Sequence, residues 1–319
     1  MPFPPTVRRV AGSAPGRLAR YARLRLSRRR AGLVLVYHKL GEPPGDPKRE
    51  LMPALSPRLF EAQLGHLGRL YRVVPSHELR AAVGARRRGQ RFPVAITFDD
   101  DLASHVRHAL PALRATGLPA TFFLSGASLE GPYRFWWERL QAAFDASRDL
   151  GVLAAAGVPA GAAGITGWGE ALEAATPQER GLAAEALAEL VGPDPDDAGM
   201  RAADVAALAA AGLEIGFHTL RHDPLPALDD AALEAALRDG REALERLAGG
   251  KITTISYPHG KADARVAAAA RVAGYESGFT GVPVAVTPAS DPVLLPRIDV
   301  LNTTVDDFAR QLIGALQRS

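Results

Sequence analysis

Short strand-like runs alternate with helix-like stretches along most of this chain, and this alternation limits the fold more than any other feature. Apolar runs of strand length recur at 33–37, 94–98, 120–124, 213–217, 252–257, 276–280 and 294–300. Helical patterns lie between several of them, at 60–70, 105–115, 229–247 and 262–272. Gly117 and Gly274 are expected to end two of these helices. The order predicts a parallel sheet with crossover helices, and about seven such units favour a barrel over an open sheet.

Two polar motifs follow two of these runs, where the strands are expected to end. Asp99 and Asp100 follow the second run, and His218 and His222 follow the fourth. Adjacent carboxylates repel each other, so a buried strand end keeps both mainly where a cation or a proton makes them useful. Imidazole nitrogen with carboxylate oxygen is a ligand set that suits zinc and its neighbours. The motifs predict a divalent-metal site with a spare carboxylate, which indicates metal-assisted hydrolysis. The alternative is a helix N-cap with a solvated neighbour.

Length and composition allow a single large domain. The 319 residues can form one barrel-sized domain or two smaller ones, and 47% hydrophobic with 23% charged residues is ordinary for a globular enzyme. The lack of cysteine excludes disulfides and thiolate ligands without identifying the compartment. No apolar run approaches the length of a membrane span, so we expect a cytoplasmic protein.

Positive charge is concentrated at the start of the chain. Residues 1–30 hold nine arginines and no acidic residue, so the remaining chain has 29 basic against 35 acidic residues. We expect residues 1–30 to form a basic arm that is solvated and partly disordered, with contact to anionic lipid or nucleic acid as the alternative. Arginines interrupt this segment throughout, which argues against a signal peptide. Residues 31–319 are expected to form the barrel.

Residues 130–211 interrupt the alternation. This segment is rich in alanine and glycine and predicts helices joined by loops. We expect an insertion over the barrel mouth and not an independent domain. Trp136 and Trp137 lie near its start, and aromatic side chains at a helix start more often anchor the helix than stack on a sugar ring.

The two motifs resemble those of the polysaccharide deacetylase family, also called the NodB-homology or carbohydrate esterase 4 group. Residues 97–100, with the sequence Thr-Phe-Asp-Asp, match the first family motif, and His218-Thr219-x-x-His222 matches the second. The likeness covers most of residues 31–310 outside the insertion. It implies a distorted (β/α) barrel that removes acetyl groups from N-acetylated sugars.

The resemblance also implies roles for the motif residues. Asp99 is then the general base, while Asp100, His218 and His222 hold one divalent metal ion. Zinc is the expected ion, with cobalt, manganese, nickel and iron as alternatives. Thr219 is expected to orient the histidines through a hydrogen bond.

Three positions depart from the family pattern. Asp101 follows the aspartate pair where the family usually has glycine, and Ser256 stands where the third motif normally carries arginine. The histidine of the C-terminal leucine-x-histidine motif is missing from residues 300–303. These losses leave open a glycan-binding protein without catalysis.

Candidate replacements resemble the permuted branch of the family, in which an N-terminal strand ends in Tyr-His. Residues 34–38 fit that description, so His38 is the expected general acid, with a buried structural histidine as the alternative. Arg297 resembles the arginine of this branch that pairs with the base, with a surface arginine at a strand start as the alternative. By likeness, the backbone N–H of Tyr257 binds the oxyanion, and His259 is a candidate substrate contact.

The expected function is therefore a hydrolase that removes N-acetyl groups from a polysaccharide or glycan precursor. A non-sugar amide or an O-acetyl ester is the alternative substrate, because related barrels use the same ligands on other linkages. We expect a carbohydrate substrate and no nucleic-acid partner, and the sequence does not define an oligomeric state.

Overall fold

The chain is described by a computed structural model over residues 14–42, 46–159, 164–300 and 302–318. The first 13 residues of the expected basic arm lie outside the described residues, as do positions 43–45, 160–163, 301 and 319. None of the described helices is both long enough and apolar enough to cross a lipid bilayer.

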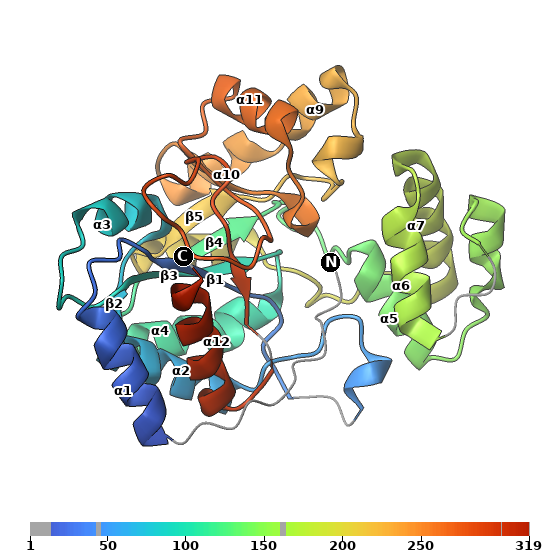
Figure 1. The fold of residues 1–319 in the computed structure, drawn as a ribbon. Coiled ribbons are helices and arrows are strands. Elements are labelled where there is room, and N and C mark those ends of the chain that lie inside the picture. Colours follow the sequence, from blue (N-terminus) through green and yellow to red (C-terminus); the bar gives the residue numbers. More distant parts are fainter. Residues whose placement is uncertain (1–13, 43–45, 160–163, 301, 319) are drawn as a thin grey trace.

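One parallel sheet forms the centre of the molecule (Figure 1). Its strands are β1 (Leu33–Tyr37), β2 (Arg72–Val73), β3 (Pro93–Asp99), β4 (Thr121–Leu124), β5 (Glu214–Phe217), β6 (Thr254–Ser256), β7 (Ser277–Phe279) and β8 (Ile298–Asp299). Their order is β7-β6-β5-β4-β3-β1-β8, with β2 beside β3, and the paired strands are parallel. A β-bridge between Phe279 and Leu295 places the segment before β8 next to β7. The first and last strands of the sheet are therefore connected. The arrangement confirms the predicted distorted (β/α) barrel.

The central strands are apolar along their whole length because both of their faces are covered. All residues of β1 and β3 are buried, and Leu33 to Tyr37 pair in register with Val94 to Phe98. Strands of a parallel sheet lie between helices, which explains continuous apolar runs in place of an alternating pattern. Parallel pairing also collects the carboxyl ends of the strands at one edge of the sheet.

Helices surround the sheet and extend beyond it on one side. The α-helices are α1 (Ala14–Arg25), α2 (Pro57–Leu70), α3 (Leu79–Ala85), α4 (Leu110–Thr116), α5 (Trp136–Asp145), α6 (Gly164–Ala174), α7 (Pro177–Val191), α8 (Ala202–Ala210), α9 (Asp230–Ala236), α10 (Arg241–Ala248), α11 (Ala264–Val272) and α12 (Val305–Gln317). Shorter helical turns are η1 (Pro47–Arg49), η2 (Ser76–Glu78), η3 (His105–Ala109), η4 (Leu150–Ala156), η5 (Leu225–Ala227) and η6 (Pro258–Gly260). In Figure 1, α1, α2 and α12 lie below the strands, α9, α10 and α11 lie above them, and α5 to α7 lie to the right of the barrel.

The predicted helix at 105–115 forms, with one local difference. Its first turn, η3, is π-helical, and α4 continues it. Gly117 ends α4 with a left-handed φ of 64°, as its position predicts. The predicted helix at 60–70 begins earlier, at Pro57, because the Ser56 side chain caps it by accepting a hydrogen bond from Leu59 N–H.

Two other predicted elements are corrected. The predicted helix at 229–247 is two helices, α9 and α10, because Gly240 takes a left-handed φ of 85° between them. The predicted strand at 294–300 contains only the two residues of β8. Pro296 lies within that range and has no N–H to donate to a sheet ladder, which shortens the strand.

Residues 130–211 form helices, as predicted, and these divide into two parts. The helices α5, η4, α6 and α7 share an apolar cluster of their own, in which Leu140 and Leu187 are fully buried. Helix α8 packs instead against η3, β5 and α10, and its Val205 and Leu208 belong to the main core. One part of the segment therefore lies on the barrel, and the other extends from it.

The described part of the basic arm, from residue 14 onward, begins with α1. This helix contacts α12, where the Arg17 guanidinium pairs with Asp306. The Tyr21 hydroxyl donates to the carbonyl of Leu70 at the end of α2. Arg17 and Tyr21 are buried, so α1 is an integral helix of the barrel surface.

Candidate active site

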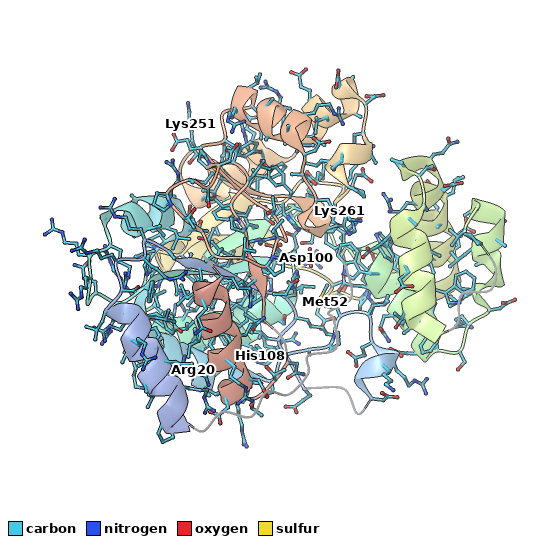
Figure 2. The ribbon with its side chains drawn as sticks, in the orientation of Figure 1. Arg20, Met52, Asp100, His108, Lys251 and Lys261 are labelled. Atoms are coloured by element: carbon cyan, nitrogen blue, oxygen red, sulfur yellow. The ribbon has the colours of Figure 1, made fainter. Side chains whose placement is uncertain are left out.

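The carboxyl ends of neighbouring strands bring the two predicted motifs together. Asp99 is the last residue of β3, Asp100 follows it, and His218 follows β5. Only β4 lies between β3 and β5 in the sheet, so segments that are far apart in the sequence meet at one edge. Figure 2 shows Asp100 near the middle of the molecule, between the barrel and the helices α5 to α7.

Asp100, His218 and His222 have the geometry of a ligand set for one metal ion. The Nε2 atoms of His218 and His222 each lie 3.6 Å from Asp100 Oδ1, and one donor atom from each residue lies within 4.8 Å of the others. All three side chains are buried, and Asp100 Oδ1 has no hydrogen-bond partner among the described residues. His218 Nδ1 lies 2.8 Å from the carbonyl oxygen of Ser256, so Nδ1 donates and the lone pair of Nε2 faces Asp100. These residues fit a divalent cation.

The electrostatics of the cluster agree with that fit. Burial lowers the pKa of His218 and of His222, so both imidazoles are neutral, which is the form that binds metals. Burial and the neighbouring Asp99 carboxylate raise the pKa of Asp100 well above its usual range. A bound cation would act in the opposite direction and favour the Asp100 carboxylate.

Asp99 is held by Arg297, as the sequence predicts. Arg297 donates two hydrogen bonds of 2.7 Å, one to each carboxylate oxygen, and the Ser256 hydroxyl donates a third, of 2.9 Å. Burial acts to raise the pKa of Asp99, but the charge of Arg297 and the hydrogen bonds that it donates outweigh burial and hold the pKa well below its usual range. Asp99 is therefore an ionised and fixed carboxylate beside the three candidate ligands, and Arg297 is buried, not a surface residue.

His38 follows β1 and is half-buried near Asp99. Burial lowers the pKa of His38, and the charges of Asp99 and Asp299 act in the opposite direction. Its carbonyl oxygen lies 3.2 Å from Nε2 of His105, which is fully buried, and burial lowers the pKa of His105 to about 3. The neutral His105 ring thus donates to the backbone of His38 and fixes the end of β1, a role that the sequence alone does not reveal.

Two expected roles are corrected by the hydrogen bonds. The Tyr257 backbone N–H donates to the Phe279 carbonyl at 3.0 Å between β6 and β7, so it is not available to an oxyanion. The Thr219 hydroxyl is buried and has no hydrogen-bond partner among the described residues, so it orients neither histidine. The Ser256 carbonyl does so for His218.

Backbone strain is concentrated at this site. Five non-glycine residues of the described chain have positive φ, and four of them belong to the predicted motifs: Asp100, Thr219, His222 and His259, with φ of 72°, 61°, 54° and 57°. Such conformations cost on the order of 1–3 kcal/mol each and persist where the surrounding structure enforces them, most often at functional sites. The backbone therefore marks the same residues as the side-chain chemistry.

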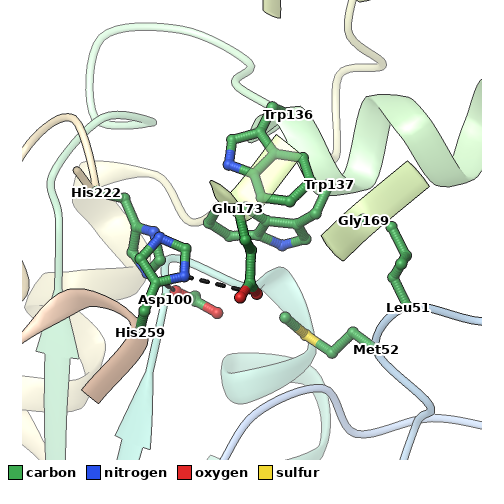
Figure 3. Close-up of a pocket in the computed structure, with 9 residues that line it drawn as sticks. All are labelled: Leu51, Met52, Asp100, Trp136, Trp137, Gly169, Glu173, His222 and His259. Atoms are coloured by element: carbon green, nitrogen blue, oxygen red, sulfur yellow. Dashed lines mark ion pairs between the residues drawn. The ribbon is translucent and has the colours of Figure 1, made fainter. Parts of the chain in front are cut away.

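The insertion supplies one wall of the pocket beside the cluster (Figure 3). The pocket is lined by Leu51, Met52, Asp100, Trp136, Trp137, Gly169, Glu173, His222 and His259. Glu173 reaches in from α6, and its Oε1 lies 3.7 Å from Nδ1 of His259, which places the predicted contact residue His259 at the pocket. Glu173 has no signal in the sequence, because its position depends on how the insertion packs.

Trp137 anchors helix α5, as predicted, and it also lines the pocket. Its ring stacks on Phe135 with centroids 4.4 Å apart and an angle of 4° between the rings, which anchors the start of α5. It also lies 4.6 Å from the His222 ring, measured between centroids, and faces the pocket. The predicted anchor is therefore also a wall of the site.

Asp101, which departs from the family pattern, has a structural function. Its carboxylate accepts hydrogen bonds from the Ser125 N–H at 2.8 Å and from the Ser125 hydroxyl at 2.7 Å, and its carbonyl accepts from Met200 N–H at 2.8 Å. These bonds join the loop after β3 to the end of β4 and to the segment before α8. The added carboxylate is thus satisfied, and it fixes the loop that carries Asp100.

Comparison with solved structures agrees with the barrel fold. The chain is similar in structure to the deacetylase PplD of Streptococcus pyogenes, which was solved in complex with acetate, with a TM-score of 0.62, 16% identity, and coverage of 88% of this chain and 98% of that chain. It is similar to IcaB of Ammonifex degensii, with a TM-score of 0.57, 18% identity, and coverage of 90% and 97%. It is also similar to the putative polysaccharide deacetylase BA0330 of Bacillus anthracis, with a TM-score of 0.59, 18% identity, and coverage of 88% and 69%. At these identities the structures support the fold alone.

The sequence itself identifies the family. A search of curated protein sequences gives no significant match. The sequence model described as polysaccharide deacetylase matches residues 86–278, which include both motifs and more than half of the chain. The chain therefore belongs to the polysaccharide deacetylase family.

Proposed function

We propose that this chain is a divalent-metal-dependent hydrolase that removes N-acetyl groups from the amino sugars of a polysaccharide or glycan precursor. Family membership supports deacetylation in general. One observation supports metal-dependent N-deacetylation in particular. The buried, ionised Asp99, which is held by Arg297, lies beside the candidate metal ligands Asp100, His218 and His222.

Asp100, His218 and His222 would hold the metal ion. A divalent ion bound there would polarise the acetyl carbonyl and make water more acidic. Neutral imidazole and carboxylate favour zinc, and cobalt, manganese, nickel or iron suit the same ligands. The hydrogen bond from His218 Nδ1 to Ser256 supports this assignment, because it leaves Nε2 free to bind.

Asp99 and His38 would transfer the protons. Asp99 accepts a proton from the attacking water as the water oxygen bonds to the acetyl carbon, and Arg297 keeps the carboxylate ionised and aimed. The carbon–nitrogen bond then breaks, and His38, in its imidazolium form, donates a proton to the departing amine. The proton taken up by Asp99 then returns to His38 through solvent, which restores both side chains. Acetate and the free amino sugar are the products, so atoms and charge balance.

The pocket beside the cluster suits a small acyl group. Its volume is about 50 Å³, and Met52 and Trp137 give it apolar walls. An acetyl methyl group fits these properties. Acetylated sugars, acetyl esters and small amides share this group, so a panel of all three distinguishes the proposed substrate from the alternatives.

The test is acetate release from N-acetylglucosamine oligomers by the Asp99→Asn variant. Asparagine keeps the shape of the side chain but cannot accept the proton, so we expect the rate to fall by about a hundredfold or more. Asp230→Asn is the matched control, because Asp230 lies on the exposed face of α9. Full activity of Asp99→Asn would remove Asp99 from the mechanism, and wild-type turnover of cyclic amides without sugars would change the substrate class.

A further inference from the structure

Helix α1 has one face fixed to the barrel and the opposite face exposed. The Arg17 guanidinium pairs with Asp306, and the Tyr21 ring lies 5.0 Å from that of Tyr71 and 6.2 Å from that of Phe92, measured between centroids. These contacts fix the rotation of the helix about its axis. The residues on the other face therefore point outward in a defined way.

Part of the exposed surface of this segment is apolar. Leu18 and Leu26 are 54% and 58% exposed, and with the exposed Ala22 they are spaced by four residues, so they form one stripe. Leu26 directly follows α1 and continues its hydrogen bonding, because its N–H donates to the Ala22 carbonyl. Only one other leucine of the described chain, Leu182, is a large exposed hydrophobic residue, so the stripe is a local feature of this segment.

Exposed arginines also lie on α1 and beside it. Arg20 and Arg23 are exposed on α1, and the loop after α3 adds the exposed Arg87, Arg88 and Arg91. The loop is joined to the end of α1, because Gly89 N–H donates to the Arg25 carbonyl at 2.7 Å and Arg88 Nε donates to the Leu26 carbonyl at 2.8 Å. Residues 14–41 and 79–98 contain no acidic residue. We call this surface, Leu18 and Leu26 with these five arginines, the basic face.

From this surface we propose that the basic face binds an anionic phospholipid bilayer, with α1 lying parallel to the membrane plane. Arginine guanidinium groups pair with lipid phosphates, while the leucines enter the boundary between headgroups and acyl chains. Figure 1 shows α1 on the side of the barrel away from α5 and α6, which contribute lining residues to the pocket. A membrane at the basic face would leave that pocket wall uncovered, so the binding does not depend on the proposed hydrolysis.

The leucines favour lipid over nucleic acid as the partner. Phosphate contacts with nucleic acid need only the arginines, and exposed leucines between them gain nothing from a sugar–phosphate backbone. In a bilayer interface both kinds of residue contribute. The two partners therefore predict different effects of removing the leucines.

The test measures binding of the full chain to vesicles by flotation. Vesicles of phosphatidylcholine with one quarter phosphatidylglycerol are expected to bind the chain, and pure phosphatidylcholine vesicles are expected to bind it much more weakly. Arg20→Gln with Arg23→Gln should weaken binding by about 25-fold, because each arginine near an anionic surface contributes a factor of about five to the affinity. Leu18→Ser with Leu26→Ser should weaken binding by about tenfold or more.

The matched control carries two charge removals elsewhere. Arg246→Gln with Lys251→Gln removes two exposed positive charges from α10 and the segment after it, and binding should not change. Figure 2 shows Lys251 in the upper part of the view and Arg20 in the lower part. Thermal melting verifies that each variant is folded. If the control variant loses as much vesicle binding as the Arg20 and Arg23 variant, the proposal is overturned. Wild-type binding that is equally strong to pure phosphatidylcholine vesicles would overturn it as well. If the leucine variant binds vesicles and duplex DNA as the wild type does, the face is a general polyanion surface and the lipid proposal is wrong.

Discussion

Replacing Arg297 by methionine should destabilise the fold strongly, because it leaves the Asp99 charge buried. The side chains of Arg297 and Asp99 are 3% and 4% exposed, and two hydrogen bonds of 2.7 Å join them. Removing one partner of a buried pair costs about 3–5 kcal/mol, since the remaining charge has lost its compensation. Ser256 still donates one bond to Asp99, which places the expected loss nearer the lower value.

A double-mutant cycle measures this coupling. Urea unfolding is followed for the wild type, Arg297→Met, Asp99→Asn and the double variant, in chelator so that no metal contributes. In the Asp99→Asn background the arginine substitution should cost at least about 2 kcal/mol less than in the wild type, because no buried anion remains. Arg297→Lys should recover part of the loss, since an ammonium supplies the charge without the bidentate geometry.

The reasoning is refuted if Arg297→Met costs below about 1 kcal/mol, or if the two substitutions are additive. Either result would mean that Asp99 takes a proton or reaches solvent easily. Asp99 would then not be the fixed anion that the proposed chemistry requires. A loss of this size is measurable, because typical domains have unfolding free energies of about 5–15 kcal/mol.

Two further predictions concern the metal and the insertion. Removing metal with a chelator should lower the wild-type melting temperature, by an amount equivalent to about 2.7 kcal/mol when the free ion was at 100 times its Kd. The melting temperature of His222→Gln should change little on the same treatment. Metal analysis that finds no bound ion, together with an unchanged wild-type melting temperature, would contradict this prediction. Asp194→Asn should destabilise the wild type at pH 7 by about 1–2 kcal/mol, because Asp194 accepts a 2.7 Å bond from Arg139 on α5. Burial acts to raise the pKa of Asp194, but the bonds from Arg139 and from Arg134 N–H outweigh it, so the folded-state pKa lies below the usual value. The stabilisation by the Asp194 carboxylate is therefore present above the unfolded-state pKa of about 3.9 and is lost as pH falls through the folded-state pKa. The melting temperatures of the wild type and Asp194→Asn should therefore converge in acid. A difference in melting temperature that stays constant with pH would contradict this prediction.

The barrel and the centre of the site were predictable from the sequence because both depend on strand ends. Apolar runs fix β1, β3, β4 and β5, and a parallel sheet brings the residues after them to one edge, so Asp99 and His218 had to meet. Arg297 was predictable for the same reason, since it precedes β8, which pairs with β1.

Other features depend on packing that no local pattern encodes. Ser256 stands where arginine was expected, and only the structure shows that its hydroxyl and its carbonyl hold Asp99 and His218. Glu173 reaches the pocket because α6 packs on α5, a contact within the insertion that no local pattern predicts. Helix α12 is different: its amphipathic pattern and its Thr304 N-cap are present in the sequence, so its formation follows from local signals.

The backbone and the side chains of the site support the proposed cation independently of each other. Asp100 and His222 take left-handed backbone conformations that cost free energy, and a fold retains such residues only where the neighbouring structure enforces them. The bonds of Asp101 to β4 enforce the first of these, since they hold the loop that carries Asp100. The buried Oδ1 of Asp100 gains no protein hydrogen bond among the described residues in return, which a purely structural role would not explain. A ligand at that oxygen explains both the strain and the missing bond, because it supplies the free energy that the protein contacts do not.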